Sequence, residues 1–164
     1  MRNNNCRIGF TLLELVIVMI IVSVLSTIAV TSLSGTIDHY KLTQAAEVIQ
    51  RFDAHARRQA VNHRQAVKAT VEPLRNQLQV ETSTDQAIRH FRLPSGVGIG
   101  EILLRRKTVA SGNFEIRFNQ DGGSRSYALE LKRGKRSQWI VVLGGSGQIM
   151  EMNQRGEVSE FLSL

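Results

Sequence analysis

The chain begins with a polar leader that is followed by one long apolar segment. Residues 1–9 carry Arg2 and Arg7, and the next 21 residues, 10–30, contain a single charged side chain, Glu14. A helix of that length rises about 31 Å, close to the thickness of the hydrocarbon core of a bilayer. The pattern therefore predicts a membrane-spanning helix over residues 10–30.

Glu14 lies inside this predicted span, close to its first end. An acidic side chain at the middle of a membrane helix costs on the order of 2.5–3.5 kcal/mol, and less near an end. Such a cost indicates a positively charged partner, and cleavage between Gly9 and Phe10 would create an α-amino group at a similar depth. Within one straight helix the amine and the fifth residue have limited freedom to meet. We therefore expect the amine of a neighbouring copy to pair with Glu14.

A helical pattern continues beyond the span and becomes amphipathic. Residues 31–35 are small and polar, which weakens a helix without ending it. Apolar side chains then recur at three- and four-residue intervals to about residue 61. These are Ile37, Tyr40, Ala45, Val48, Ile49, Phe52, Ala56 and Ala60. The opposite face carries Lys41, Glu47, Arg51, Arg57 and Arg58. We expect one long helix whose second half covers a sheet.

From about residue 66 the apolar period changes to two, which is typical of strands. Residues 66–71 and 77–80 are predicted to form a hairpin, and residues 82–89 are expected to be irregular or a short helical turn. Further strands are expected, separated by glycine-containing turns, over 97–105, 114–118, 127–131, 139–143 and 148–152. The predicted fold class is α+β, with the long N-terminal helix packed on an antiparallel β meander.

Charge orients the predicted span. Arg2 and Arg7 precede it, so the positive-inside rule places the leader in the cytoplasm and the bulk of the chain across the membrane. The formal net charge is +7, and without these two arginines and Glu14 the exported part carries +6. This excess favours an anionic neighbour without identifying it.

The sequence offers little support for catalysis. The only cysteine, Cys6, lies in the leader, so removal of the leader excludes disulfides, cysteine-ligated zinc and a cysteine nucleophile. No two of His39, His55, His63 and His90 have the four-residue spacing of a helical zinc site. No nucleophilic triad is detectable. We interpret the protein as non-enzymatic, with no catalytic residue, metal or cofactor.

Two basic clusters are expected at strand ends or hairpin tips. They comprise Arg105, Arg106, Lys107, Lys132, Arg133, Lys135 and Arg136. Exposed cations at such tips can contact phosphates and give salt-sensitive binding. The alternative, which we favour, is that they are ordinary solvated loop residues. Tyr127 and Trp139 have the spacing of a packed sheet face and are expected in the core.

The segment Gly9-Phe10-Thr11-Leu12-Leu13-Glu14 with its apolar helix resembles the prepilin processing motif of type IV pilins and type II secretion pseudopilins. The resemblance implies cleavage after Gly9 and methylation of Phe10, the new N-terminus, by a prepilin peptidase that is also an N-methyltransferase. It also implies that Glu14, at the fifth mature position, helps to align subunits. The alternatives are a secretory signal peptide, whose apolar core would precede the cut, and an uncut signal anchor.

The second half of the chain carries another resemblance. Phe91-x-Leu93-Pro94-x-Gly96-Val97, Phe118-x-x-Asp121-Gly122-x-Ser124, Trp139-Ile140-Val141-Val142 and Gly147-x-Ile149 resemble the GspH/FimT group. This group contains the minor pseudopilin H of type II secretion and a related minor pilin. Together, the two resemblances imply a type IV pilin-like protein with a cleaved leader (1–9), a transmembrane and filament-core helix (10–30) and an exported globular domain (31–164).

The implied function is that of a minor pseudopilin, a structural subunit of the periplasmic pseudopilus that helps to drive protein export. The implied partners are the prepilin peptidase, other pseudopilins or pilins, an inner-membrane assembly platform and secreted cargo. The subunit would span the bacterial inner membrane once, with a cytoplasmic N-terminus and a periplasmic C-terminal domain, before it enters the pseudopilus. The alternative is a minor type IV pilin that binds DNA through the basic loops for uptake, or that aids pilus assembly.

Overall fold

The computed structural model describes residues 11–81, 88–105, 107–109 and 112–163, apart from the side chains of residues 28–34, 107 and 163. The chain divides into two compact units, Met1–Ile37 and Asp38–Leu164, here called unit 1 and unit 2. The predicted leader, residues 1–9, lies outside the described residues.

Helix α1 runs from Leu12 to His63, close to the predicted end at residue 61. In unit 2 its apolar face is buried and includes Leu42, Ala45, Ala46, Ile49, Phe52, Ala56 and Ala60. The prediction is wrong for Ile37 and Tyr40, whose side chains are 48% and 62% exposed. It is also wrong for Arg57, which the pattern places on the solvent face and which is only 14% exposed.

Nine strands, one short 3-10 helix and a second α-helix follow α1 in the described residues. The elements are β1 (Val67–Glu72), η1 (Pro73–Arg75), β2 (Gln77–Glu81), β3 (Ile88–Arg92), β4 (Gly98–Leu104), β5 (Lys107–Val109), β6 (Phe114–Phe118), β7 (Tyr127–Arg133), β8 (Arg136–Val142), β9 (Ile149–Met152) and α2 (Arg155–Ser163). The strands expected from the period of two are all present, within a few residues of their predicted ends.

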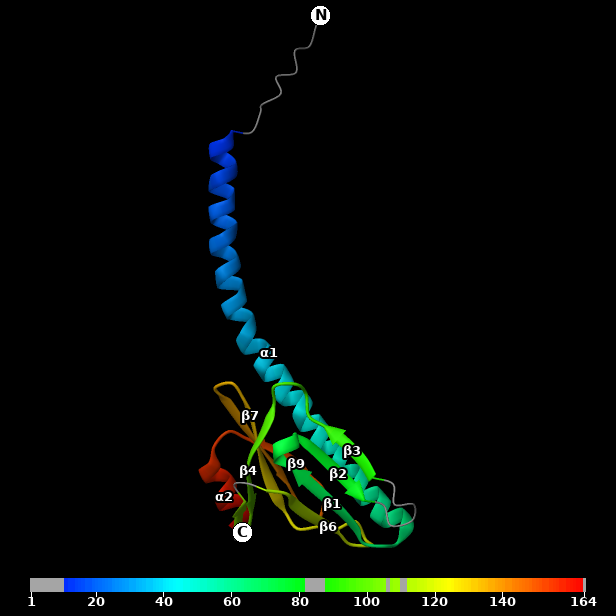
Figure 1. Cartoon of the computed structure of the whole chain (residues 1–164). Coiled ribbons are helices and arrows are strands. Elements are labelled where there is room, and N and C mark those ends of the chain that lie inside the picture. Colours follow the sequence, from blue (N-terminus) through cyan, green and yellow to red (C-terminus); the bar gives the residue numbers. More distant parts are fainter. Residues whose placement is uncertain (1–10, 82–87, 106, 110–111, 164) are drawn as a thin grey trace, which may run out of the picture. The chain divides into compact units, whose positions relative to one another are not determined.

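The strands form two antiparallel sheets, and not the single meander that was expected. Sheet 1 has the order β3-β2-β1-β6, and sheet 2 has the order β5-β4-β7-β8-β9. The β1–β2 hairpin is confirmed, with Thr70 opposite Gln79. The other side of β1 pairs with β6, so that Val67 lies opposite Phe118. A strand from much later in the chain therefore completes sheet 1 (Figure 1).

Besides η1, two strands and one α-helix were not predicted. Strand β3 begins at Ile88, inside the segment that was expected to be irregular. Strand β5 is a three-residue partner for the end of β4. Helix α2 packs Val158 and Leu162 against the Trp139 side of sheet 2.

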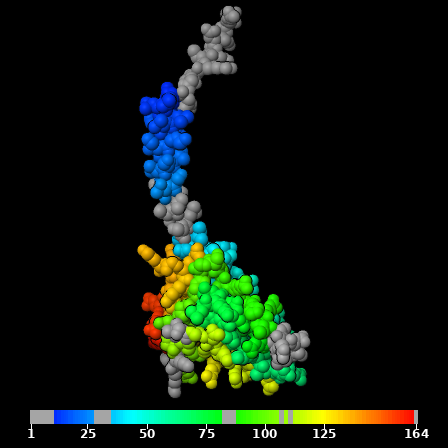
Figure 2. Space-filling model, viewed as in Figure 1, coloured from blue at the N-terminus to red at the C-terminus, as the bar shows by residue number. Residues whose placement is uncertain are grey.

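Sheet 2 is therefore buried on both faces. Tyr127, Leu129 and Leu131 of β7 belong to the core shared with α1 and sheet 1. Ala128 of β7 belongs to the smaller core under α2, because successive strand residues point to opposite faces. In the space-filling view, green side chains of β2 and β3 cover the middle of one face of unit 2, and yellow residues around 115–125 reach its edge (Figure 2).

Candidate functional site

Glu14 lies in the first turn of α1, and Thr11 caps that turn. The backbone N–H of Glu14 donates a hydrogen bond to Thr11 Oγ1 at 3.2 Å, and the N–H of Leu15 donates to the Thr11 carbonyl oxygen at 3.3 Å. A threonine three residues before a glutamate has the spacing of a capping box. This role of Thr11 was not predicted, although the T-x-x-E spacing is its signal.

An acidic side chain at position 14 therefore also stabilises the start of α1 itself. A carboxylate in the first turn of a helix interacts favourably with the helix dipole, by about 0.3–1 kcal/mol. Among the described residues, no basic side chain forms an ion pair with the Glu14 carboxylate. Gly9 and Phe10, the predicted processing residues, lie outside that part of the chain.

The side chains that follow Glu14 on α1 are apolar and exposed. They include Leu15, Val16, Ile17, Val18, Met19, Ile20, Ile21, Val22, Val24 and Leu25. The hydroxyls of Ser23 and Ser26 donate hydrogen bonds to the carbonyl oxygens of Met19 and Val22, at 2.8 and 2.7 Å. The polar groups of these two serines are thus satisfied within the helix, and the surface around them is available to an apolar environment.

No helix in the described part of the chain is long and apolar enough to cross a membrane. Phe10 and the side chains of residues 28–30, which belong to the predicted span, lie outside the described residues.

Among the described basic residues, Arg105 and Lys132 lie at opposite ends of the β4–β7 pair, because Leu104 lies opposite Tyr127 and Gly98 lies opposite Lys132. Arg106 and the side chain of Lys107 lie outside the described residues, and Arg105 follows the end of β4. Lys132 Nζ lies 2.9 Å from Glu130 Oε2. Lys135 and Arg136 are exposed in the β7–β8 hairpin, as predicted.

Arg133 has a structural role within unit 2. Its Nε lies 2.6 Å from Asp38 Oδ1, and its Nη1 donates a hydrogen bond to the carbonyl oxygen of Ser95 at 2.9 Å. Lys41 Nζ also donates to Ser95, at 3.1 Å to the carbonyl oxygen and 2.9 Å to Oγ. The side chain of Arg133 therefore links α1, the turn before β4 and the β7–β8 hairpin. Such engagement leaves it poorly placed to bind a phosphate.

A polar network that was not predicted surrounds Asp53 and Arg57 in unit 2. The Asp53 side chain is 2% exposed, and Arg57 Nε lies 2.5 Å from its Oδ2. Tyr127 donates its hydroxyl hydrogen to Asp53 Oδ1 at 3.1 Å. The available signal was the four-residue spacing of an acid and a base beside core positions, which places both on one helix face.

The guanidinium of Arg57 also joins two loops. Its Nη1 donates to the carbonyl oxygens of Gly122 and Gly144 at 2.8 and 2.7 Å. Its Nη2 lies 3.2 Å from both Ser124 Oγ and the Leu143 carbonyl oxygen. A buried guanidinium is stable only when its donors are satisfied, and here the loops after β6 and β8 supply the acceptors.

This arrangement accounts for two of the three glycines of the GspH/FimT-like pattern, Gly122 and Gly147. Gly122 adopts a φ of +82°, and a Cβ atom there would lie 3.1 Å from a methyl group of Val61. Gly147 adopts a φ of +73°, and a Cβ atom there would lie 2.8 Å from Arg57 Nε. Glycine is favoured at both positions because it tolerates positive φ and leaves room for Arg57.

Burial also shifts two titratable groups. Desolvation, followed by the charge of Asp53 and the hydrogen bond to it, raises the pKa of Tyr127 well above its usual value of 10. Desolvation, followed by the charges of Arg89 and Arg58, lowers the pKa of His55 below 6.5. Within the described residues, no group of three or more potential metal ligands is present.

A family of known proteins matches the start of the chain, and solved structures match its fold. The family described as the prokaryotic N-terminal methylation motif matches residues 4–30. No curated protein gives a significant match. The chain is similar to the type IV minor pilin FimU of Pseudomonas aeruginosa, with 15% identity and a TM-score of 0.50 over 70% of this chain and 90% of that chain. It is also similar to the minor pseudopilin EpsH from the Type 2 Secretion System of Vibrio cholerae, with 10% identity and a TM-score of 0.47 over 67% of this chain and 97% of that chain.

The likeness to FimU is one of fold. It confirms the predicted α+β architecture, in which an N-terminal helix packs on antiparallel sheets. The methylation motif lies at the start of the chain and includes the segment that resembles a prepilin processing site. The chain therefore combines a prokaryotic N-terminal methylation motif at its start with a pilin-like α+β fold.

Proposed function

We propose that the chain is a minor pseudopilin of a type II secretion system, a structural subunit of a short periplasmic filament. A prepilin peptidase cleaves it after Gly9 and methylates Phe10. The subunit then leaves the inner membrane and enters the filament, where unit 2 faces outward. The observation that supports this proposal best is the position of Glu14 on α1, in the first turn of a helix whose following side chains are apolar and exposed.

Exposed apolar surface of this extent is unfavourable in water, at roughly 25 cal/mol per Å². A bilayer covers it before assembly, and the helices of neighbouring subunits cover it in a filament. The Glu14 carboxylate then lies in an apolar environment and requires a counter-charge. The terminal amine of Phe10 in an adjacent subunit supplies that charge in this proposal.

The local and intersubunit roles of Glu14 can be separated by substitution. Glutamine can replace glutamate in a capping box, because its side chain also accepts a hydrogen bond. Glu14→Gln therefore preserves the start of the helix but removes the charge. We expect it to be inserted into the membrane and cleaved normally, and to enter the filament at a much lower level, as Glu14→Ala should.

Thr11→Val is the matched control, since it removes the N-cap oxygen and keeps the carboxylate. It should weaken the first turn by about 1 kcal/mol and leave filament incorporation close to normal. Membrane fractionation, intact mass and co-purification with sheared filaments measure the three steps. If Glu14→Gln enters filaments normally, the pairing role is wrong. If the mature chain retains residue 1, the processing proposal is wrong.

The DNA-binding minor pilin is the second candidate. Lys135 and Arg136 would contact the phosphates in this function. Both are exposed in the β7–β8 hairpin, and neither pairs with a carboxylate within the described residues. Binding of duplex DNA to the full chain in detergent micelles, measured across a salt series, tests it. A steep salt dependence that is reduced in Lys135→Ala/Arg136→Ala would favour this function. Absent or salt-independent binding would remove it.

A further inference from the structure

Strand β6 (Phe114–Phe118) is an edge strand with a groove beside it. It pairs with β1 on one side, and no described strand pairs with it on the other. In an antiparallel edge strand, alternate residues direct N–H and C=O groups away from the partner strand. A groove of about 520 Å³ lies along β6, between this strand and sheet 2, and is here called the β6 groove.

The β6 groove combines apolar and cationic side chains. Leu104, Phe114, Ile116 and Tyr127 provide apolar lining. Arg117 and Arg125 are exposed at the groove. The single carboxylate of the lining, Glu115, is already paired with Lys68, with Oε1 at 2.8 Å from Nζ. The net charge of the groove is therefore positive.

The position of Arg117 adds an unfavourable contact that a ligand could relieve. Arg117 lies directly opposite Lys68 in the β1–β6 register, and like charges at directly opposed positions are destabilising. Lys68 has Glu115 as a partner, whereas Arg117 forms no ion pair with a described residue. Arg125 also forms none within that part of the chain. A carboxylate bound between Arg117 and Arg125 would supply the missing charge.

We propose that the β6 groove binds an extended acidic segment of a partner protein, which adds to the free edge of β6 as a fifth strand of sheet 1. The backbone of the segment pairs with the unpaired groups of β6, and its alternate side chains face the apolar lining. Its carboxylates lie between Arg117 and Arg125. At about 3.3 Å per residue, the five residues of β6 match a partner segment of five or six residues.

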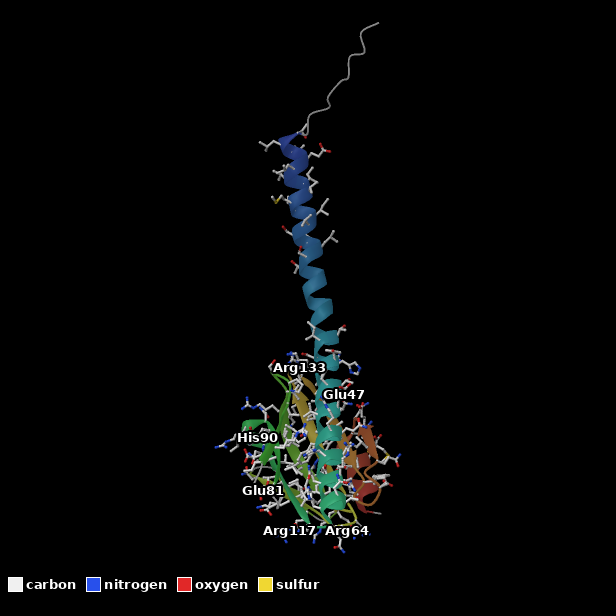
Figure 3. All side chains as sticks on the ribbon, turned by 90° about the vertical axis from the view of Figure 1, so that its right-hand side faces the viewer. Glu47, Arg64, Glu81, His90, Arg117 and Arg133 are labelled. Atoms are coloured by element: carbon white, nitrogen blue, oxygen red, sulfur yellow. The ribbon has the colours of Figure 1, made fainter. Side chains whose placement is uncertain are left out.

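The proposal concerns unit 2 alone and does not depend on the filament role of Glu14. It also involves a different surface from the basic β7–β8 hairpin, because Arg117 and Arg133 lie at opposite ends of unit 2 (Figure 3). A strand-adding peptide is favoured over a nucleic acid because the site offers a free strand edge and an apolar lining.

Model peptides test the proposal on the full chain in detergent micelles. The probe is a fluorescein-labelled Val-Glu-Val-Glu-Val-Glu peptide with a blocked C-terminus. The first control has lysine in place of each glutamate, and the second has N-methyl groups on alternate backbone amides, which prevents strand pairing. Fluorescence anisotropy measures binding, and hydrogen exchange locates the protected amides. We expect the acidic peptide to bind at least tenfold more tightly than either control and to protect amides of β6.

Charge reversal provides the specificity test. Arg117→Glu/Arg125→Glu should weaken binding of the acidic peptide by at least about tenfold, since two attractive contacts become repulsive. Arg92→Glu, on the opposite edge strand β3, is the matched control and should change binding less than about twofold. Equal binding of the N-methylated peptide, protection on β3 instead of β6, or no binding of the acidic peptide at millimolar concentration would each overturn the proposal.

Discussion

Arg57 Nε lies 2.5 Å from Asp53 Oδ2, and the two side chains are 14% and 2% exposed. The loops after β6 and β8 meet on the same guanidinium, through the carbonyl oxygens of Gly122 and Gly144. One ion pair on α1 therefore holds together parts of the chain that lie 65 and 87 residues away from Arg57.

Removal of the Arg57 guanidinium should strongly destabilise unit 2. Arg57→Met leaves the Asp53 carboxylate buried without its partner, which typically costs about 3–5 kcal/mol. Denaturant unfolding of the full chain in micelles, followed by the fluorescence of the single tryptophan, Trp139, measures the loss. Arg58→Met is the control, because Arg58 is exposed, and it should change the free energy of unfolding by less than about 0.5 kcal/mol. Adding Asp53→Asn to Arg57→Met should restore part of the loss; equal effects of the two arginine variants would contradict the prediction.

A methyl group at Gly144 should not fit. A Cβ atom there would overlap the carbonyl oxygen of Ser124 and lie 2.6 Å from the carbonyl carbon of Arg125. Both are backbone atoms of a loop that is already held by the hydrogen bond from Ser124 N–H to the Gly144 carbonyl oxygen. We expect Gly144→Ala to cost on the order of 1–3 kcal/mol or more. Gly145→Ala is the matched control, since a Cβ atom at Gly145 meets nothing within 4 Å. The same unfolding midpoint in both variants would argue against this packing.

The ionisation of Tyr127 should make unit 2 less stable at high pH. Its pKa is raised in the folded state, so the unfolded chain loses this proton first, near pH 10. The contribution of Tyr127 to the free energy of unfolding is fully present below pH 10. It falls as the pH rises toward the pKa of Tyr127 in the folded state, by up to about 1.4 kcal/mol per pH unit. Tyr127→Phe should lower stability at pH 8, because a hydrogen bond to Asp53 is lost, and should reduce the slope above pH 10. Parallel stability curves for the parent and the variant between pH 9 and 11 would refute this.

The lowered pKa of His55 has the opposite consequence. The unfolded chain binds the proton first, so the contribution of His55 to stability is present above pH 6.5 and is lost as pH falls through the folded pKa. Arg89→Gln should raise the pKa of His55, because it removes a nearby positive charge. Arg92→Gln is the control. Successive strand residues point to opposite faces, so Arg92, three positions after Arg89, points to the other face of β3. An NMR titration of the His55 ring measures both, and an unchanged His55 pKa in Arg89→Gln would exclude the interaction.

The sequence predicts the elements of this protein better than their pairing. The three- and four-residue spacing of Ala45, Ile49, Phe52 and Ala56 determines the buried face of α1, and all four are fully buried. The period of two likewise locates the strands. It does not say which strands pair, because β1 presents the same alternation to β2 and to β6. The separation into two sheets depends on tertiary packing and could not be predicted from alternation alone.

The Arg57 network shows a second limit of sequence analysis. Charged residues on a helix usually face solvent, so the pattern assigns Arg57 to the wet face together with Arg58. The two arginines differ because Arg57 lies four residues after Asp53, under loops whose carbonyl oxygens accept hydrogen bonds from its guanidinium. Helix α2 was not predicted because its sequence pattern is short and weak. Its only apolar residues with helical spacing are Val158, Phe161 and Leu162, and it contains Gly156, which has a low helix propensity.

The β1–β6 pairing has a consequence during synthesis. A ribosome releases β1 well before β6, and the chain between them includes not only β2 and β3 of the same sheet but also β4 and β5, which belong to the other sheet. Until Phe114–Phe118 emerge, the nascent chain presents one side of β1 as an unprotected strand, and such strands promote aggregation. A chaperone that shields the nascent segment from residue 67 onward would therefore have its greatest effect in the interval before β6 appears.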